Sequence, residues 1–251
     1  MTTSHLKSNY PPYFHLLKNA QAYYKRYNKY KRAQSEVQNQ IETTREMLNY
    51  LASIDASLTT ATTKNEIAEI KQELITAGLL QNQGKKHKGQ EPKSEPLLIK
   101  LSKETTLYIG KNNKQNDYVT FTLARGKDLW FHTKNIPGSH VILKTTLPQA
   151  TASDIAAAVL LAAYFSKSRS GSKVPVDCTE RRFVKKPNGA KPGFVIYTDQ
   201  TTYYATPDEA AAQKTFKQII KTPGLPTRCF YFHHDYFYNI FKASSPKYSF
   251  N

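Results

Sequence analysis

The sequence predicts an α+β protein, with a long helical coiled-coil hairpin followed by a compact module that has a mostly antiparallel sheet and helices. Three observations support this fold class. An apolar heptad repeat runs through residues 12–58 with no proline or glycine between Leu16 and Leu58, residues 81–96 are polar and basic, and short apolar runs then alternate with turn residues. We therefore expect helices in residues 1–80, a linker in 81–96, a module in 97–208 and an aromatic-rich tail in 209–251, to which no role is assigned.

The heptad repeat begins at Leu16 and advances by four and three residues. Ten of its thirteen positions are apolar or aromatic. We call these positions the heptad seam: Leu16, Ala20, Tyr23, Tyr27, Tyr30, Gln34, Val37, Ile41, Thr44, Leu48, Leu51, Asp55 and Leu58. Such spacing is typical of a coiled coil. The stretch Ser57–Thr63 interrupts the repeat and predicts a turn, and a second helix is expected over 64–80, with Gly78 placed to end it. The two helices are unequal, so an uncovered part of the seam would favour self-association.

Within the module, apolar runs at 97–101, 107–109, 129–132 and 139–143 predict strands. Further strands are expected over 173–184, 194–197 and 202–205. The alanine-rich segment 150–166 predicts a helix with Ser153 or Thr151 as its cap. The pattern of 117–124 fits either a helix or a strand.

The charge of the chain indicates a polyanionic partner. Its formal net charge is +17, and residues 97–207 hold 16 Lys or Arg against 7 Asp or Glu. Lys25, Arg26, Lys29 and Arg32 form a basic cluster on the expected long helix. Basic clusters near aromatic residues suit phosphate contacts and base stacking, although many basic runs are only solvated faces.

Other classes of function find little support. Two cysteines are too few for a disulfide framework, and no segment has the length and hydrophobicity of a signal peptide or a membrane span. We therefore expect a cytoplasmic protein. We find no Ser/His/Asp arrangement, paired carboxylates or HExxH motif, so no enzyme activity and no cofactor are expected. His132, His140 and Asp128 are too few for zinc, so we also expect no metal.

The most informative stretch is 116–143, which holds the single tryptophan, Trp130. Trp130 is more often a core residue at such a position, and in a strand it shares its face with His132. The Pro137–Gly138 pair predicts a tight turn at which the backbone can approach a ligand. Protonated histidines could bind phosphate, and the asparagines could bind base edges or cap a helix. The RNA-binding candidates in the module are Lys111, Asn112, Asn113, Asn116, Asp128, Trp130, His132, Pro137, Gly138, Ser139, His140, Arg181, Arg182 and Lys186.

An ordered series of motifs resembles the C-terminal RNA-binding module of the NFACT family. The motifs are Ile109–Asp117, Asp128–His132, Pro137–Val141, Ala162–Lys167 and Gly189–Tyr197, and Asn19–Lys29 resembles the start of the family's second coiled-coil arm. The resemblance covers roughly residues 18–208. It favours a helix at 117–124. The family's N-terminal domain and helix-hairpin-helix region have no counterpart here, so the chain is expected to be a C-terminal fragment.

The resemblance implies a role in RNA binding. The family includes the RqcH proteins of bacterial ribosome quality control, so the implied partners are the large ribosomal subunit and tRNA, and the chemistry belongs to the ribosome. In streptococci and staphylococci these proteins carry the name fibronectin-binding or fibrinogen-binding protein A (FbpA). This leaves a rival hypothesis, a surface adhesin fragment that binds host fibronectin or fibrinogen at the cell surface.

Overall fold

The computed structural model describes residues 12–81 and 94–207, and these divide into two compact units between Asn49 and Tyr50. Most of the expected linker and all of the tail 209–251 lie outside the described residues. No helix in the described ranges is long and apolar enough to cross a membrane.

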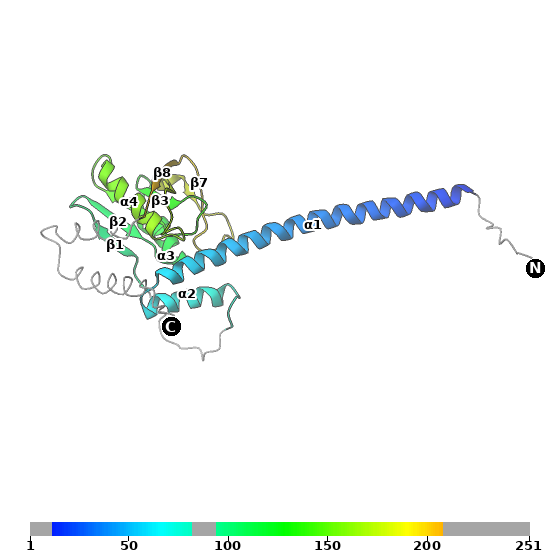
Figure 1. Ribbon diagram of the computed structural model, residues 1–251, viewed down its shortest axis with the longest axis horizontal. Helices are drawn as coiled ribbons and strands as arrows, with labels where there is room; N and C mark the ends of the chain where they lie inside the picture. The colour runs from blue at the N-terminus through cyan, green and yellow to red at the C-terminus, as the bar shows by residue number, and fades with distance from the viewer. Residues whose placement is uncertain (1–11, 82–93, 208–251) are drawn as a thin grey trace, which may run out of the picture. The chain divides into compact units, whose positions relative to one another are not determined.

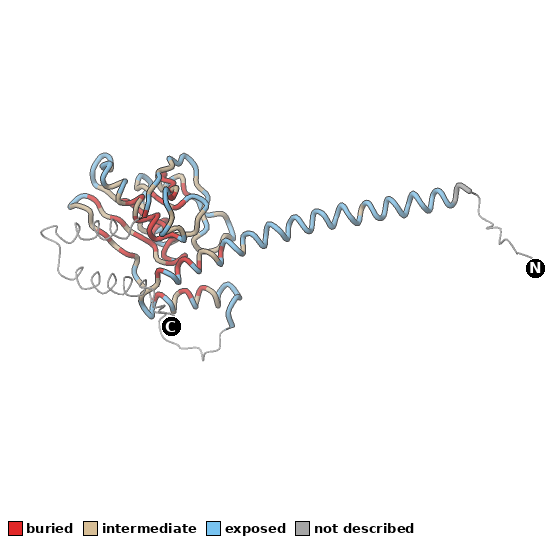
Figure 2. Tube along the Cα trace, viewed as in Figure 1, coloured by how far each residue is buried: buried red, intermediate tan, exposed pale blue. Residues whose placement is uncertain are grey.

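The first helix, α1, spans Pro12–Thr60 and confirms the predicted long helix. Its early turns are exposed to solvent, as the pale trace in Figure 2 shows. Seam residues such as Leu16, Tyr23 and Leu48 are each more than half exposed. Because no described residue covers this part of the seam, the predicted coiled-coil hairpin is not confirmed.

The second unit begins with the last turns of α1. After a short turn, α2 spans Lys64–Thr76 and is capped by Thr63, whose hydroxyl accepts a hydrogen bond from the Glu66 amide. Tyr50 near the end of α1 donates to Glu73 of α2, so the two helices contact each other over this stretch. The capping box explains why the chain restarts a helix directly after the predicted break.

The module is built on a six-stranded antiparallel sheet with the order β1-β2-β4-β3-β5-β8. The strands are β1 (Leu97–Lys100), β2 (Thr105–Ile109), β3 (Leu129–Thr133), β4 (Val141–Thr145), β5 (Val174–Glu180) and β8 (Thr201–Ala205). These bounds confirm the mostly antiparallel sheet that the sequence predicts. They lie within a few residues of the predicted runs.

One face of the sheet packs against α4 (Ala152–Tyr164), whose cap is Thr151 (Figure 1). Phe131 and Val141 point to this face, together with the alanines of α4. This is the larger apolar core of the module. It forms because alternate residues of a strand point to opposite sides of the sheet.

The opposite face carries the elements that matter most for the site. Trp130 and Ile142 lie on this side, one residue out of step with Phe131 and Val141. They are covered by the single π-helical turn η1 (Val119–Leu123), which continues α3 (Asn113–Tyr118), and by a two-stranded ribbon of β6 (Val184–Lys185) and β7 (Ile196–Tyr197). The 3₁₀ turn η2 (Arg181–Phe183) joins β5 to β6. The segment 117–124, ambiguous from its pattern, is therefore helical, as the family resemblance predicts.

Candidate nucleic-acid interface

The loop between β2 and α3 is held closed by its own polar side chains. Asn112 caps α3 by accepting a hydrogen bond from the Gln115 amide at 2.9 Å, and the Gln115 side chain accepts from the Lys111 amide at 3.0 Å. Gly110 lies so close to α3 that a β-carbon there would come within 2.3 Å of the Asn116 side-chain oxygen. Of the two roles considered for the asparagines, capping is the one that the geometry shows for Asn112.

Three glutamates of α2 take up the remaining polar groups of this loop. The side-chain amide of Asn112 donates to the Glu69 carboxylate at 2.7 Å, and the side-chain amide of Asn113 donates to the Glu73 carboxylate at 2.9 Å. Lys111 forms an ion pair with the third, Glu66. Residues three and seven positions apart lie on one face of a helix, so α2 presents all three carboxylates to the loop. Both asparagines are buried, and their amides serve the fold in this structure.

Asn116 connects this loop to the second motif. Its side-chain oxygen accepts from the His140 amide at 3.0 Å, and its side-chain nitrogen donates to the Gly138 carbonyl at 3.3 Å. The Gly110 amide donates to the His140 carbonyl at 3.0 Å. Two motifs that are separated in sequence are thus one hydrogen-bonded unit.

The Pro137–Ser139 turn is packed against the end of α4. Gly138 forms a β-bridge with Ser166, and the Ser139 amide donates to the Phe165 carbonyl at 3.0 Å. A β-carbon on Gly138 would lie 2.8 Å from the Ser166 β-carbon. Gly138 is absent from the positive-φ residues of the described chain, so the need for glycine here comes from close packing and not from a left-handed backbone. The expected close backbone approach exists, and it is an approach to the protein itself.

Trp130 is fully buried at the centre of the second core. His132 stacks on its ring with 5.7 Å between centroids, as the shared strand face predicts, and the His140 ring meets its edge at 5.1 Å. Burial lowers the pKa of His132 to about 4 and lowers the pKa of His140 well below its ordinary value. Both rings are therefore neutral near pH 7, which argues against their binding phosphate as cations.

Two further polar residues, Asp177 and Thr120, lie beside the two histidines. Asp177 of β5 stands opposite His132 in the strand register and accepts hydrogen bonds from the Tyr197 hydroxyl at 2.8 Å and the Thr202 hydroxyl at 2.6 Å. Thr120 bonds the His140 ring nitrogen at 2.9 Å. Sequence reasoning missed Asp177, and the only available signal was an acidic residue inside an apolar strand.

The remaining module candidates lie toward solvent or make turn contacts. The Asp128 carboxylate accepts from the Arg125 amide at 2.7 Å, which closes a turn. The Arg181 guanidinium donates to the Thr120 carbonyl at 2.9 Å and lies over the Phe121 ring. Arg182 is exposed and pairs with Glu180, whereas Lys186 is exposed and pairs with Asp117. Arg182 and Lys186 thus remain accessible to a phosphate, and a contact by the buried candidates would require the module to open.

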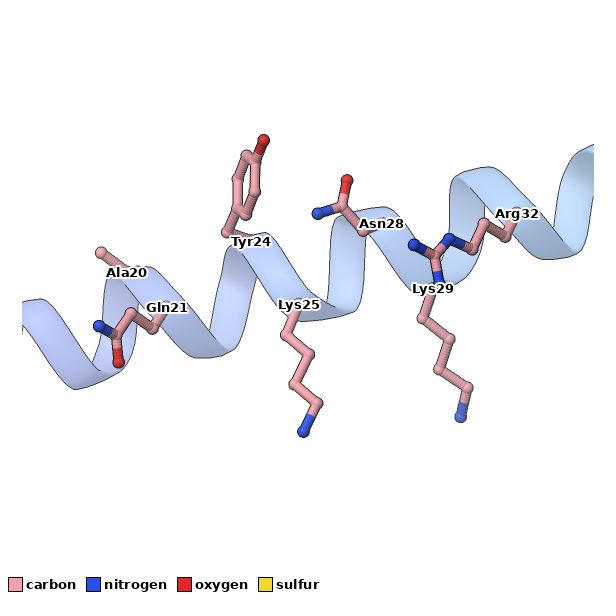
Figure 3. Close-up of a pocket in the computed structure, with 7 residues that line it drawn as sticks. All are labelled: Ala20, Gln21, Tyr24, Lys25, Asn28, Lys29 and Arg32. Atoms are coloured by element: carbon pink, nitrogen blue, oxygen red, sulfur yellow. The ribbon is translucent and has the colours of Figure 1, made fainter.

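On α1, the four basic candidates do not all lie on one face. Lys25, Lys29 and Arg32 are exposed and recur at helical spacing along one face, and Figure 3 shows Lys25 and Lys29 extending in the same direction. Arg26 lies apart, over the Tyr23 ring at 5.9 Å. All the residues in Figure 3 come from a single helix, so they form an open surface. We call Lys25, Lys29 and Arg32 the basic face of α1.

The fold and these surfaces define a class: an α+β module preceded by a long helix with separate basic and aromatic faces. Residues 97–198 match the model of the NFACT protein RNA binding domain, and residues 11–94 match that of the NFACT N-terminal and middle domains. The chain belongs to the NFACT family.

Curated relatives and a solved structure agree with this assignment. The chain is 41% identical over 192 residues to the Rqc2 homolog RqcH of Bacillus subtilis, and 44% identical over 190 residues to that of Streptococcus pneumoniae. Each comparison covers 76% of this chain. The chain spans only about a third of the length of these relatives, 33% of the Bacillus subtilis protein and 34% of the Streptococcus pneumoniae protein. The structure of the C-terminal part of the fibronectin/fibrinogen-binding protein from Streptococcus suis is 41% identical, with a TM-score of 0.69 and 79% of both chains covered.

Proposed function

We propose that this chain is a non-catalytic RNA-binding part of an RqcH-like protein and that it contacts the large ribosomal subunit and tRNA in the cytoplasm. The observation that carries the proposal is the match of residues 97–198 to the RNA binding domain of the family. The 41–44% identity to proteins named RqcH directs the choice of partner toward the ribosome.

The distribution of charge supports the same proposal. The module has a balance of +9, from 16 basic and 7 acidic residues, and the basic face of α1 adds three exposed cations. A surface of this kind binds nucleic-acid phosphates with release of counterions, which makes the affinity depend on salt. We expect the basic face and the module each to contact RNA, with the exposed aromatic residues of the seam reserved for a protein contact.

The basic face gives a direct test. Replacing Lys25, Lys29 and Arg32 by glutamate should weaken binding of the full chain to purified large subunits. Losing three phosphate contacts should also reduce the slope of log affinity against log salt by about 2.7, if each contact contributes about 0.9. The measurement is a binding titration at several salt concentrations. An unchanged slope would remove the basic face from the proposal.

The matched control replaces Tyr23, Tyr27 and Tyr30 on the seam by glutamate. These side chains are 59–68% exposed, and an uncovered aromatic stripe favours self-association. The tyrosine variant should keep RNA binding by the module and shift the chain toward monomer in light scattering. If it keeps its mass and helicity but loses RNA, the stripe is a stacking surface and our assignment of the faces is wrong.

A second candidate function is adhesion to fibronectin or fibrinogen at the cell surface. It is favoured by one specific observation, the name of the structurally similar Streptococcus suis protein, which describes fibronectin and fibrinogen binding. A parallel pull-down with large subunits and immobilised fibronectin, at two salt concentrations, separates the two. We expect the subunits to be retained with a strong salt dependence. Retention by fibronectin alone would reverse our preference.

A further inference from the structure

The β6–β7 ribbon has one face in the core and the other in solvent. Its inner pair is Val184 opposite Tyr197, and both side chains belong to the core around Trp130. Its outer pair is Lys185 opposite Ile196. The inner pair explains why the ribbon is fixed to the sheet, but it gives no reason for the composition of the outer face.

Large apolar side chains are exposed on this outer face and in the turn that leads into β7. Phe194 and Ile196 are two residues apart in the chain, and each is 52% exposed. Val195 between them packs against the core, as expected when neighbouring residues in an extended segment point to opposite sides. An exposed phenylalanine beside an exposed isoleucine indicates an interaction surface more strongly than either residue alone.

The segment that builds the ribbon is strongly basic in sequence. The segment from Glu180 to Tyr197 contains five Lys or Arg residues and a single acidic residue, Glu180. Glu180 is paired with Arg182, and the nearby Asp117 is paired with Lys186. Lys185 is exposed directly across the ribbon from Ile196. A protein partner with an ordinary surface would not be selected by this excess of positive charge, whereas a polyanion would.

The loop that carries Phe194 is also held in place from beneath. Asp117 accepts from the Gly193 amide at 3.2 Å as well as binding Lys186, and Lys191 lies over the Tyr50 ring at 4.5 Å. Gly193 has a φ of +78°, and a β-carbon there would come within 2.6 Å of the Asn113 side chain. The loop is thus anchored to the buried network, so the outer face is ordered before any ligand arrives. A preordered platform loses less conformational entropy on binding.

We propose that the outer face of the β6–β7 ribbon, formed by Phe194, Ile196 and Lys185, is a stacking platform for unpaired RNA bases. The Phe194 ring receives a base, Ile196 covers its edge, and Lys185 contacts the adjoining phosphate. Aromatic stacking on exposed bases is a general mode of recognition for single-stranded RNA and tolerates different sequences. This inference rests on the proposed RNA-binding function and identifies unpaired nucleotides as the part of the RNA that this surface takes.

The test uses the full chain and a short single-stranded RNA that contains 2-aminopurine, whose fluorescence reports stacking. The wild type should change the probe fluorescence on binding. Phe194→Ala combined with Ile196→Ala should abolish that change and weaken binding by about fivefold or more, since base stacking on one aromatic residue is worth at least about that factor. The slope of log affinity against log salt should stay the same, because Lys185 and the other cations remain.

Two further variants make the result interpretable. Tyr204→Ala removes an aromatic side chain that is 69% exposed on β8, outside the platform, and should bind as the wild type does. Phe194→Leu keeps an apolar side chain but removes the ring, so it tests stacking even if the double variant is unstable. Trp130 fluorescence verifies that each variant is folded.

The possible outcomes separate the two proposals. If the wild type binds no RNA at low salt, the proposed function fails and the platform fails with it. If the wild type binds RNA, and the folded Phe194→Leu variant binds equally well with the same change in probe fluorescence, only the platform is refuted. If the platform variants lose fibronectin binding and keep RNA binding, the surface serves a protein and the inference is wrong.

Discussion

Gly110 sits where the two halves of the buried network meet, and replacing it by alanine should loosen both. The new β-carbon would lie 2.3 Å from the Asn116 side-chain oxygen and 2.7 Å from the Asn116 amide nitrogen. The second of these atoms belongs to the backbone of α3 and cannot rotate away. The substitution must therefore displace α3 or the end of β2.

The net cost can be estimated from two destabilising contributions and one that offsets them. Overpacking of a well-packed site costs about 1–3 kcal/mol. Moving Asn116 also strains its hydrogen bonds to the His140 amide and the Gly138 carbonyl, each worth about 1 kcal/mol. The smaller entropy of the unfolded alanine chain returns about 0.4–1 kcal/mol. We therefore expect Gly110→Ala to lower the free energy of unfolding by about 2–4 kcal/mol.

The measurement is urea unfolding of the full chain, followed by fluorescence. Trp130 is the single tryptophan and is fully buried beside this network, so its emission reports the unfolding of the module. Gly126→Ala is the matched control, because the nearest atom to its new β-carbon is 3.9 Å away and Gly126 is not among the positive-φ glycines of the described chain. Equal midpoints for Gly110→Ala and the wild type would refute this account of the motif.

Three other predictions concern the same network. Gly138→Val should destabilise the chain by about 1–3 kcal/mol through its clash with Ser166, more than His132→Ala does, and equal urea midpoints for the two variants would contradict this. Burial lowers the pKa of His132 to about 4, so between about pH 4 and 6.5 the unfolded chain binds more protons than the folded chain. The stability that the neutral ring contributes should be complete above this window and should fall as the pH drops through it. The loss should be at most about 3 kcal/mol, because His132 keeps partial exposure. Urea unfolding at several pH values should show a steeper loss for the wild type than for His132→Gln. Burial raises the pKa of Glu73, so the stability that its protonated form contributes is lost as the pH rises through that pKa. Among the described residues, the second carboxylate oxygen of Glu73 is buried without a hydrogen-bond partner. Glu73→Gln should therefore be at least as stable as the wild type at pH 7, and a loss above about 2 kcal/mol would show that the charge is needed.

Much of the fold follows from local patterns in the sequence. The long helix, the break near residue 60 and the strand pairs all come from periodicity and turn residues, which act over a few positions. The alternation of Trp130 and Phe131 places one on each side of the sheet, so the side shared by Trp130 and His132 could also be predicted. The uncovered seam marks the limit of this reasoning, because a heptad repeat shows that a helix has an apolar face but does not identify what covers it.

The site was harder to predict because its contacts are distant in sequence. Asn112 and Asn113 bond glutamates 43 and 40 positions earlier, and nothing in the local pattern distinguishes those glutamates from solvated residues on a helix face. Gly138 was expected to face a ligand, but its close neighbour is Ser166, which only the packing of α4 brings near. Motif residues that suggest recognition are used here largely to build the module.

The most direct test of the central claim is the affinity of the full chain for a structured RNA across a series of salt concentrations. A chain with a net charge of +17 that binds through phosphate contacts should give a straight decline of log affinity with log salt. Purified large ribosomal subunits should show the same decline. An affinity that does not change with salt, or an absence of binding at low salt, would contradict the claim that this chain is an RNA-binding part of an NFACT protein.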